Sequence, residues 1–316
     1  MKKILITALG TMNASAIINA LRKYDESFRL IGADIYSKES IANSLFVDEF
    51  YQFPRADIET DKYVNYLYDF CVHHAIDYCF CFIDEEVSAL ANQINRFNTI
   101  GTKICIPDVN TINMCHDKHV FVQWLQANMP KYCIQTYQSP DEIKYYPIFI
   151  KPKFGRASIG CKKVNSFSEL KSLHIDWNKT IVQEYVEGDI IAVDVVSNLK
   201  YGQVQCCQRK ELLRNNNGCG VAVEIVRDTR IEEICMQLVQ KMHVNGVINV
   251  EFFVSRDFVK IIEINPRLSA GTMFSYKAGL NTVVQAIHIV NGNPCEQSNI
   301  QVGSRYAKRY ETYQTK

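Results

Sequence analysis

The chain lacks a charge imbalance, because 35 basic and 34 acidic residues leave a net charge of +1 at pH 7. A balanced composition favours neither nucleic acid nor an anionic membrane as a partner. No apolar run approaches the roughly 20 residues that a membrane span needs. The first residues, MKKILITALG, run straight into strand-like sequence without a signal-peptide cleavage site. We therefore expect a cytoplasmic protein that contacts neither nucleic acid nor membrane.

Paired cysteine motifs are also missing, although the chain has 12 cysteines. The cysteines are scattered, largely within apolar stretches. Neither Cys79-x-Cys81 nor the adjacent Cys206 and Cys207 has the CxxC spacing of a zinc site. We expect them to be reduced residues of the core.

Glycine is scarce where a dinucleotide site would need it. Residues 1–107 alternate predicted strands and helices, beginning with strands at 3–9 and 30–35 around a helix at 16–23, which implies a parallel sheet with helices on both faces. The turn TALGTMNASA has one glycine where the dinucleotide fingerprint has three, although Asp34 lies about where the ribose-binding acid would be. We predict a Rossmann-like domain without a dinucleotide of its own.

A lysine ends an apolar strand and enters a glycine-containing loop in IFIKPKFGRASIG, residues 148–160. Glycine lets the backbone approach a polyphosphate, so that amides at Gly155, Ser158 and Gly160 can donate to it while Lys151 supplies positive charge. The spacing excludes a P-loop. The residues alone equally allow an ordinary hairpin whose lysine points into water.

A second strand, in TIVQEYVEGD at residues 180–189, breaks at Gly188. The backbone N–H and C=O groups of Glu184, Tyr185 and Val186 are therefore able to meet an adenine edge. Most segments of this kind are simply strand ends, and the residues alone do not separate the two cases.

Two glutamates stand inside the apolar strands of a short predicted hairpin, VINVEFFVSRDFVKIIEIN. Pairing these strands about the SRD turn places Glu251 near Glu263 on one face, with Asn265 two residues further on. A buried carboxylate needs a partner, and two carboxylates with an amide oxygen suit Mg²⁺ bridged to phosphates. We favour this interpretation over salt bridges to nearby basic residues. Arg267, just beyond, suits a phosphoryl or carboxylate oxygen.

Basic and acidic residues mark two further strand ends. Arg209 and Lys210, in QCCQRKELLR, are candidates for clamping a transferring phosphoryl group, and a solvated strand end is the equal alternative. Asp84 and Glu85 are candidates for contacting an amine substrate. Alternatively, they are acids that a helix N-terminus favours.

In this order the motifs resemble the ATP-grasp superfamily, in particular the synthetase domain of the carbamoyl phosphate synthase large chain. VKIIEINPRLSAGT is similar to the metal-binding segment of that family, GVINVEFF to the preceding strand, and KAGLNTVVQAIHIVNG to the helix that follows. HDKHVF resembles the segment that supplies the first nucleotide-binding lysine, here Lys118. IKPKFGRASIG resembles the second lysine strand with its flap, and QEYVEG resembles the adenine-binding hinge.

The resemblance covers about residues 110–292 and implies the fold class. We expect an α/β chain with an N-terminal Rossmann-like parallel-sheet domain, followed by a two-lobed α+β ATP-grasp module. The expected parts are a pre-ATP-grasp domain at 1–107, a small lobe with the glycine-rich flap at 108–188, and a large lobe with the metal site at 189–316.

The resemblance also implies a role for each matching residue. The family usually has a glutamate past the hinge glycine for the ribose hydroxyls, whereas GDIIAVD has isoleucines there, so Asp189 or Glu187 would take this role. The other implied assignments are Lys118, Lys151, Gly155, Ser158 and Gly160 at the nucleotide phosphates, Glu184, Tyr185 and Val186 at adenine, Glu251, Glu263 and Asn265 at magnesium, and Arg267 at the phosphoryl group.

The implied activity is that of an ATP-dependent, ADP-forming carboxylate–amine (or carboxylate–thiol) ligase. It would use ATP with Mg²⁺, or with Mn²⁺ in its place, on small-molecule carboxylate and amine substrates, and a homo-oligomer is compatible with it. A single grasp module argues against carbamoyl phosphate synthesis itself. The alternatives are a small-molecule kinase of the same fold and an ATP-binding module without chemistry. Residues 1–107 are expected to shape the acceptor pocket.

Overall fold

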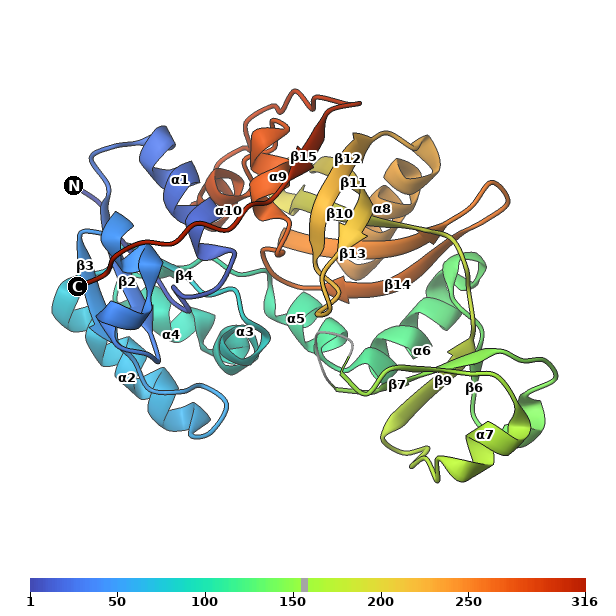
Figure 1. Cartoon of the computed structure of the whole chain (residues 1–316). Helices are drawn as coiled ribbons and strands as arrows, with labels where there is room; N and C mark the ends of the chain where they lie inside the picture. The colour runs from blue at the N-terminus through green and yellow to red at the C-terminus, as the bar shows by residue number, and fades with distance from the viewer. Residues whose placement is uncertain (155–158) are drawn as a thin grey trace.

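The computed structural model describes residues 1–154 and 159–316, which form three sheets (Figure 1). The first sheet is parallel throughout, with strand order β3-β2-β1-β4-β5. Its strands are β1 (Lys3–Ile6), β2 (Arg29–Asp34), β3 (Glu49–Gln52), β4 (Tyr78–Phe80) and β5 (Lys103–Ile104).

Helices cover both faces of this sheet because its strands are apolar on both sides. Ile4 and Ile6 pack with α1 (Ala14–Tyr24), whereas Leu5 packs on the opposite face with α2 (Thr60–His74), α3 (Asp84–Leu90) and α4 (Ile94–Thr99). Side chains alternate between the faces of a strand, so neighbouring residues of β1 enter different cores. The predicted Rossmann-like architecture is confirmed.

The second sheet is antiparallel, with order β6-β9-β7-β8. It follows helices α5 (Val109–His116) and α6 (Lys118–Asn128) and carries α7 (Phe167–Ser172). Ser166 caps α7, because its Oγ accepts a hydrogen bond from the backbone amide of Glu169. Its strands are β6 (Thr136–Tyr137), β7 (Ile148–Pro152), β8 (Lys162–Val164) and β9 (Thr180–Glu184).

The third sheet has order β14-β13-β10-β11-β12-β15 and is antiparallel. One face packs on α8 (Thr229–Met242) and on the buried side of α6. The other face packs on α9 (Thr272–Lys277) and α10 (Thr282–Val290). The strands are β10 (Asp189–Asn198), β11 (Gln203–Arg214), β12 (Gly220–Val226), β13 (Gly246–Val254), β14 (Val259–Asn265) and β15 (Arg305–Ala307).

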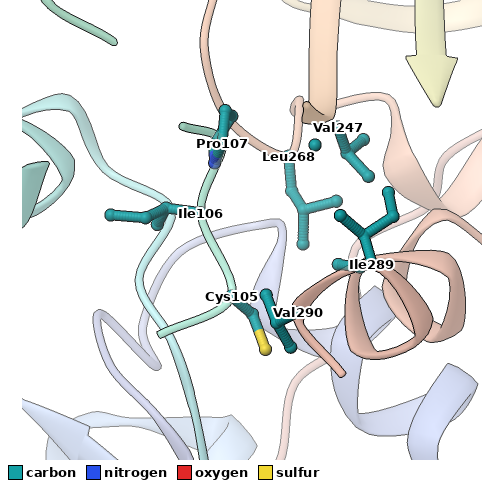
Figure 2. Close-up of a pocket in the computed structure, with 9 residues that line it drawn as sticks. Cys105, Ile106, Pro107, Val247, Leu268, Ile289 and Val290 are labelled. Carbon is teal, nitrogen blue, oxygen red and sulfur yellow. The ribbon is translucent and has the colours of Figure 1, made fainter. Parts of the chain in front are cut away.

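One apolar core joins the first domain to the third sheet, because α1 packs against both α9 and α10. Figure 2 shows part of this junction, where Cys105 and Pro107 face Leu268 and Ile289. The space between these side chains is about 10 Å³, at the lower limit for one water molecule, so the junction is packed. Gly246 permits it: its φ is +143°, and a Cβ there would lie 2.6 Å from Pro107 Cα.

The segment after β15 returns to the first domain, so the C-terminus lies beside β2 and β3 (Figure 1). Tyr313 packs edge-on against Phe46, with ring centroids 5.3 Å apart, and Tyr310 Oη lies 3.9 Å from Met12 Sδ. This segment thus ties the third sheet to the first domain. Among the described residues, the helices are all too short or too polar to span a bilayer.

Some elements differ from the sequence-based expectation. Residues 84–99 form α3, a 3₁₀ turn at Ala91–Gln93 and α4 instead of one continuous helix. The short elements β3, β6, α9 and β15 were not predicted, and neither was α5. The three sheets lie within the three predicted parts of the chain, whose exact borders stay a prediction.

Candidate active site

Two carboxylates face each other on the third sheet. The register of β13 and β14 sets Glu251 opposite Glu263, and two residues away Asn249 lies opposite Asn265. Directly opposed residues of an antiparallel pair share one face of the sheet, so these four side chains form one polar patch. The pairing of Glu251 with Glu263 is therefore confirmed.

Two lysines from residues 108–188, the predicted small lobe, lie near Glu263. Lys118, the first residue of α6, lies with Nζ 3.0 Å from Glu263 Oε2, and the buried Lys151 of β7 donates to the Ile262 carbonyl at 3.3 Å. Burial alone would raise the pKa of Glu263, but the two ammonium groups outweigh it and lower the pKa. Burial lowers the pKa of Lys151, against the opposing effect of Glu263.

Glu251 is in the opposite electrostatic situation. Burial, and then the charge of Glu263, raise the pKa of Glu251 to about 7, although Arg214 lies 3.2 Å away. One carboxylate of the pair is thus ionised well below neutrality, while the other titrates near it. Opposed pKa shifts of this kind cluster at functional sites, which agrees with the predicted role of the pair.

Arg267 links the carboxylate pair to the first domain. Its Nε and Nη2 atoms donate to the two oxygens of Asp84 at 2.6 and 3.1 Å, and Nη2 also lies 3.4 Å from Asn265 Oδ1. Asp84 is the first residue of α3, where the helix dipole favours an acid. The structure therefore joins the predicted phosphoryl-orienting arginine to the predicted amine-contacting acid.

A cleft of about 180 Å³ opens beside this ion pair, between the first domain and the loop after β14. Asn13, one of its lining residues, donates from Nδ2 to the Leu268 carbonyl at 3.3 Å. The residues that line the cleft are Thr11, Met12, Asn13, Phe82, Ile83, Asp84, Arg267 and Ala270. The loop that would start a dinucleotide site thus forms a wall of this cleft instead.

Asp34, which lies about where a ribose-binding acid would be, is held by backbone amides. Its Oδ2 accepts from Gly10 N at 2.7 Å and its Oδ1 from Tyr36 N at 3.1 Å. The carboxylate therefore fastens the turn after β1 to the end of β2.

The predicted hinge connects the second and third sheets. Glu184 ends β9, and its backbone N–H and side-chain carboxylate both bond to the backbone of Gln135. Lys163 Nζ lies 3.9 Å from the ring centre of Tyr185, and Asp189, which begins β10, is 2.6 Å from Lys210 Nζ. The adenine and ribose roles of Glu184, Tyr185, Val186 and Asp189 remain predictions.

The predicted flap lies only partly within the described residues. Gly155 and Ser158 fall outside them. Gly160 has φ of +78°, a conformation that glycine adopts without strain, and a Cβ there would lie 2.9 Å from Pro152. Its backbone is thus suited to a close approach, and its phosphate-binding role stays a prediction.

The two predicted phosphoryl clamps on β11 already have partners. Arg209 is 1% exposed and makes a bidentate ion pair with Asp194, at 2.5 and 3.1 Å, while both Ser269 and Ser275 bond to the guanidinium. Lys210 is held by Asp189. Their role in phosphoryl transfer stays a prediction, whereas the contacts of Arg209 anchor the loop that carries Arg267.

Three site residues were missed by the sequence-based prediction: Arg214, Asn249 and Asp194. Asn249 donates to Asp194 Oδ1 at 3.0 Å and lies 3.5 Å from Asn265 Nδ2, so the polar patch continues across three strands. A polar residue two positions from Glu251 inside the apolar run VINVEFF was a readable signal for Asn249. Arg214 left no such signal.

The donor set at the patch fits a hard divalent cation. Glu251, Glu263 and Asn265 offer oxygen ligands only, as Mg²⁺ and Mn²⁺ prefer when phosphates complete the coordination. Among the described residues, no group of three histidine, cysteine, aspartate or glutamate side chains is arranged to hold a metal by itself. The assignment of Glu251, Glu263 and Asn265 as metal ligands stays a prediction.

Two protein-family models match the chain. The ATP-grasp domain model matches residues 115–271, and the PylC-like N-terminal domain model matches residues 4–105. The chain therefore contains an ATP-grasp domain, as the motifs indicated, preceded by a PylC-like N-terminal domain. The second sheet, the carboxylate pair and every strand of the third sheet except β15 lie within the first match, and the second match corresponds to the parallel sheet.

Individual relatives extend this result. The chain is 23% identical over 206 residues to the 3-methyl-D-ornithine--L-lysine ligase of Methanosarcina mazei, covering 63% of this chain and 52% of that one. It is 24% identical over 227 residues to the carbamoyl phosphate synthase large chain of Thermoanaerobacter sp., covering 64% of this chain and 21% of that one. Thus the chain spans about half the length of the lysine ligase that it matches.

A solved structure shows the same fold over nearly the whole chain. The biotin carboxylase of Campylobacter jejuni superimposes with a TM-score of 0.75 at 18% identity, covering 95% of this chain and 73% of that one. At this identity the likeness is one of fold.

Proposed function

We propose that the protein is an ATP-dependent, ADP-forming ligase that joins a small carboxylate to an amine through an acyl phosphate. The observation that carries this proposal is the pair Glu251–Glu263 with Lys118 and Lys151 beside it, next to a cleft that Arg267 lines. A substrate carboxylate attacks the γ-phosphate of ATP, ADP leaves, and the amine then displaces phosphate from the acyl group.

The residues of the chain divide the electrostatic work. Lys118 and Lys151 supply positive charge to the nucleotide phosphates, and Arg267 orients the transferring group at the mouth of the cleft. Glu251, Glu263 and Asn265 would hold the metal, which when bound neutralises charge on the β- and γ-phosphates. Preformed charges of this kind need no rearrangement at the moment of reaction.

We propose that the cleft takes a small substrate that carries both a carboxylate and an amine. Arg267 and Asp84 form its charged wall, with Met12 and Phe82 as apolar lining. An amino acid could match both charges, its carboxylate at the guanidinium and its ammonium at Asp84. The name of the Methanosarcina mazei relative describes the joining of two amino acids, which supports this substrate class.

The test is a screen of amino acids and small carboxylates, singly and in pairs, for stimulated release of ADP from ATP and Mg²⁺. Glu263→Gln should abolish the stimulation while leaving the fold intact, because a charge at the metal is lost. Glu224→Gln is the matched control, since Glu224 pairs with Arg305 at the sheet edge. Near-normal turnover by Glu263→Gln would refute the metal assignment, and the absence of stimulation with every pair would refute the ligase.

A further inference from the structure

Arg214 lies between two carboxylates at the end of β11. Its Nε is 2.6 Å from Glu211 Oε2, and its Nη2 donates to Glu251 Oε2 at 3.2 Å. Arg214 and Glu211 form an ion pair without a well-aligned hydrogen bond, because within the described chain Glu211 Oε2 accepts no hydrogen bond. The guanidinium therefore lacks the two parallel hydrogen bonds to one carboxylate that bind an arginine tightly.

A double irregularity in the strand directs Arg214 to this position. The register of β11 with β12 shifts between Glu211 and Leu213, and again between Leu213 and Arg214. Such bulges redirect side chains and are over-represented next to active sites. Gly220 makes room here, since a Cβ at this residue would lie 2.8 Å from Glu211 Oε1.

Each of the two opposed carboxylates thus forms an ion pair with a basic side chain of this protein. Glu263 has Lys118 at 3.0 Å, and Glu251 has Arg214 at 3.2 Å. A divalent cation that enters alone must displace these charges. A cation that enters with a polyphosphate brings phosphate groups, and Lys118 and Arg214 can bind these in place of the carboxylates.

We propose that Arg214 is a displaceable counter-ion of Glu251, which leaves the carboxylate when metal binds and turns to the phosphate groups of the nucleotide. The inference rests on the proposed function, since it presumes that metal and nucleotide meet at Glu251. The side chain of Arg214 is 30% exposed, so solvent reaches it, whereas that of Glu211 is only 8% exposed. Arg214 is therefore a positioning residue that couples metal affinity to nucleotide affinity, and this coupling is reciprocal.

The experiment measures Mn²⁺ binding to the whole chain by the loss of the free-ion EPR signal, at pH 8, with and without a non-hydrolysable ATP analogue. The variant is Arg214→Gln. Arg305→Gln, which removes the same charge from the edge strand β15, is the matched control. Arg214→Gln should bind Mn²⁺ alone about fivefold more tightly, as expected for the loss of one partly exposed counter-ion. In Arg214→Gln, the analogue should tighten Mn²⁺ binding by a smaller factor than it does in the unchanged chain. In Arg214→Lys, this factor should lie between those of Arg214→Gln and the unchanged chain.

Two results would overturn the proposal. One is equal Mn²⁺ affinity of Arg214→Gln and Arg305→Gln without nucleotide, which would mean that Arg214 does not compete with the metal. The other is an unchanged effect of the analogue in Arg214→Gln, which would mean that the arginine does not turn to the phosphates. Failure of the unchanged chain to bind Mn²⁺ with the analogue would refute the proposed function itself, so the two failures are distinguishable.

Discussion

Replacing Glu251 by glutamine should stabilise the metal-free protein while it removes a proposed metal ligand. The pKa of Glu251 is about 7 in the fold against an ordinary value of 4.5, because the carboxylate is buried and faces Glu263. The fold therefore favours the protonated form, and the unfolded chain favours the ionised one. As pH rises from about 4.5 to about 7, the folded protein loses stability through this residue, and above pH 7 the full cost is present.

The magnitude follows from the two pKa values. Their difference of about 2.5, at about 1.4 kcal/mol for each pH unit, gives a cost of about 3.5 kcal/mol at pH 8 as an upper bound. Glutamine resembles the protonated acid and escapes this cost. At pH 5 the gain should fall to about 1 kcal/mol, because Glu251 is then protonated in the fold and only partly protonated in the unfolded chain.

The assay is thermal unfolding in EDTA at pH 5 and at pH 8, in which each kcal/mol corresponds to about 2–4 °C. Glu251→Gln should raise the midpoint by several degrees at pH 8 and by much less at pH 5. Glu224→Gln, at an ion pair with the exposed Arg305, should shift the midpoint little at either pH. A Glu251→Gln protein that is less stable than the unchanged chain at pH 8 would refute the reasoning.

Three further predictions follow from single contacts. Arg209→Met should destabilise the chain by about 3–5 kcal/mol in urea unfolding, because it leaves the carboxylate of Asp194 buried without its arginine; a change below 1 kcal/mol would contradict this. Lys151→Met should keep the fold and weaken ATP binding by at least tenfold in calorimetry, since a buried cation beside Glu263 is lost, and unchanged affinity would remove Lys151 from the site. NAD and NADP should not bind in the micromolar range, because the carboxylate of Asp34 is held by two backbone amides, and a micromolar affinity would disprove the assignment of the first domain.

The sequence was informative wherever a two-residue period and a short turn act together. The turn in VINVEFFVSRDFVKIIEIN leaves few registers in which both strands bury their apolar residues, so the opposition of Glu251 and Glu263 was predictable. The alternation of IFIK places Lys151 on the same face as Phe149, but the residues alone allowed either a phosphate-binding lysine or one in water. The structure buries this lysine.

Other parts of the site depend on contacts that a local pattern does not contain. Strict alternation would place Arg214 on the face opposite Glu211, and only the shifts in register bring both to Glu251. Arg209 looked like the end of a strand, but β11 continues to Arg214, which leaves Arg209 inside the sheet and paired. The contact of Arg267 with Asp84 joins residues 183 positions apart, a separation at which tertiary packing decides.

The acyl phosphate is the central claim, and its capture by hydroxylamine is the most direct test. With ATP, Mg²⁺ and the carboxylate substrate identified by the ADP screen, added hydroxylamine should give a hydroxamate in an amount equal to the ADP formed, and Glu263→Gln should give neither. A kinase acting on a hydroxyl group would form ADP with a stable phosphate ester and no hydroxamate, because a phosphate ester does not acylate hydroxylamine. ADP without hydroxamate, together with a stable phosphate ester, would contradict the account.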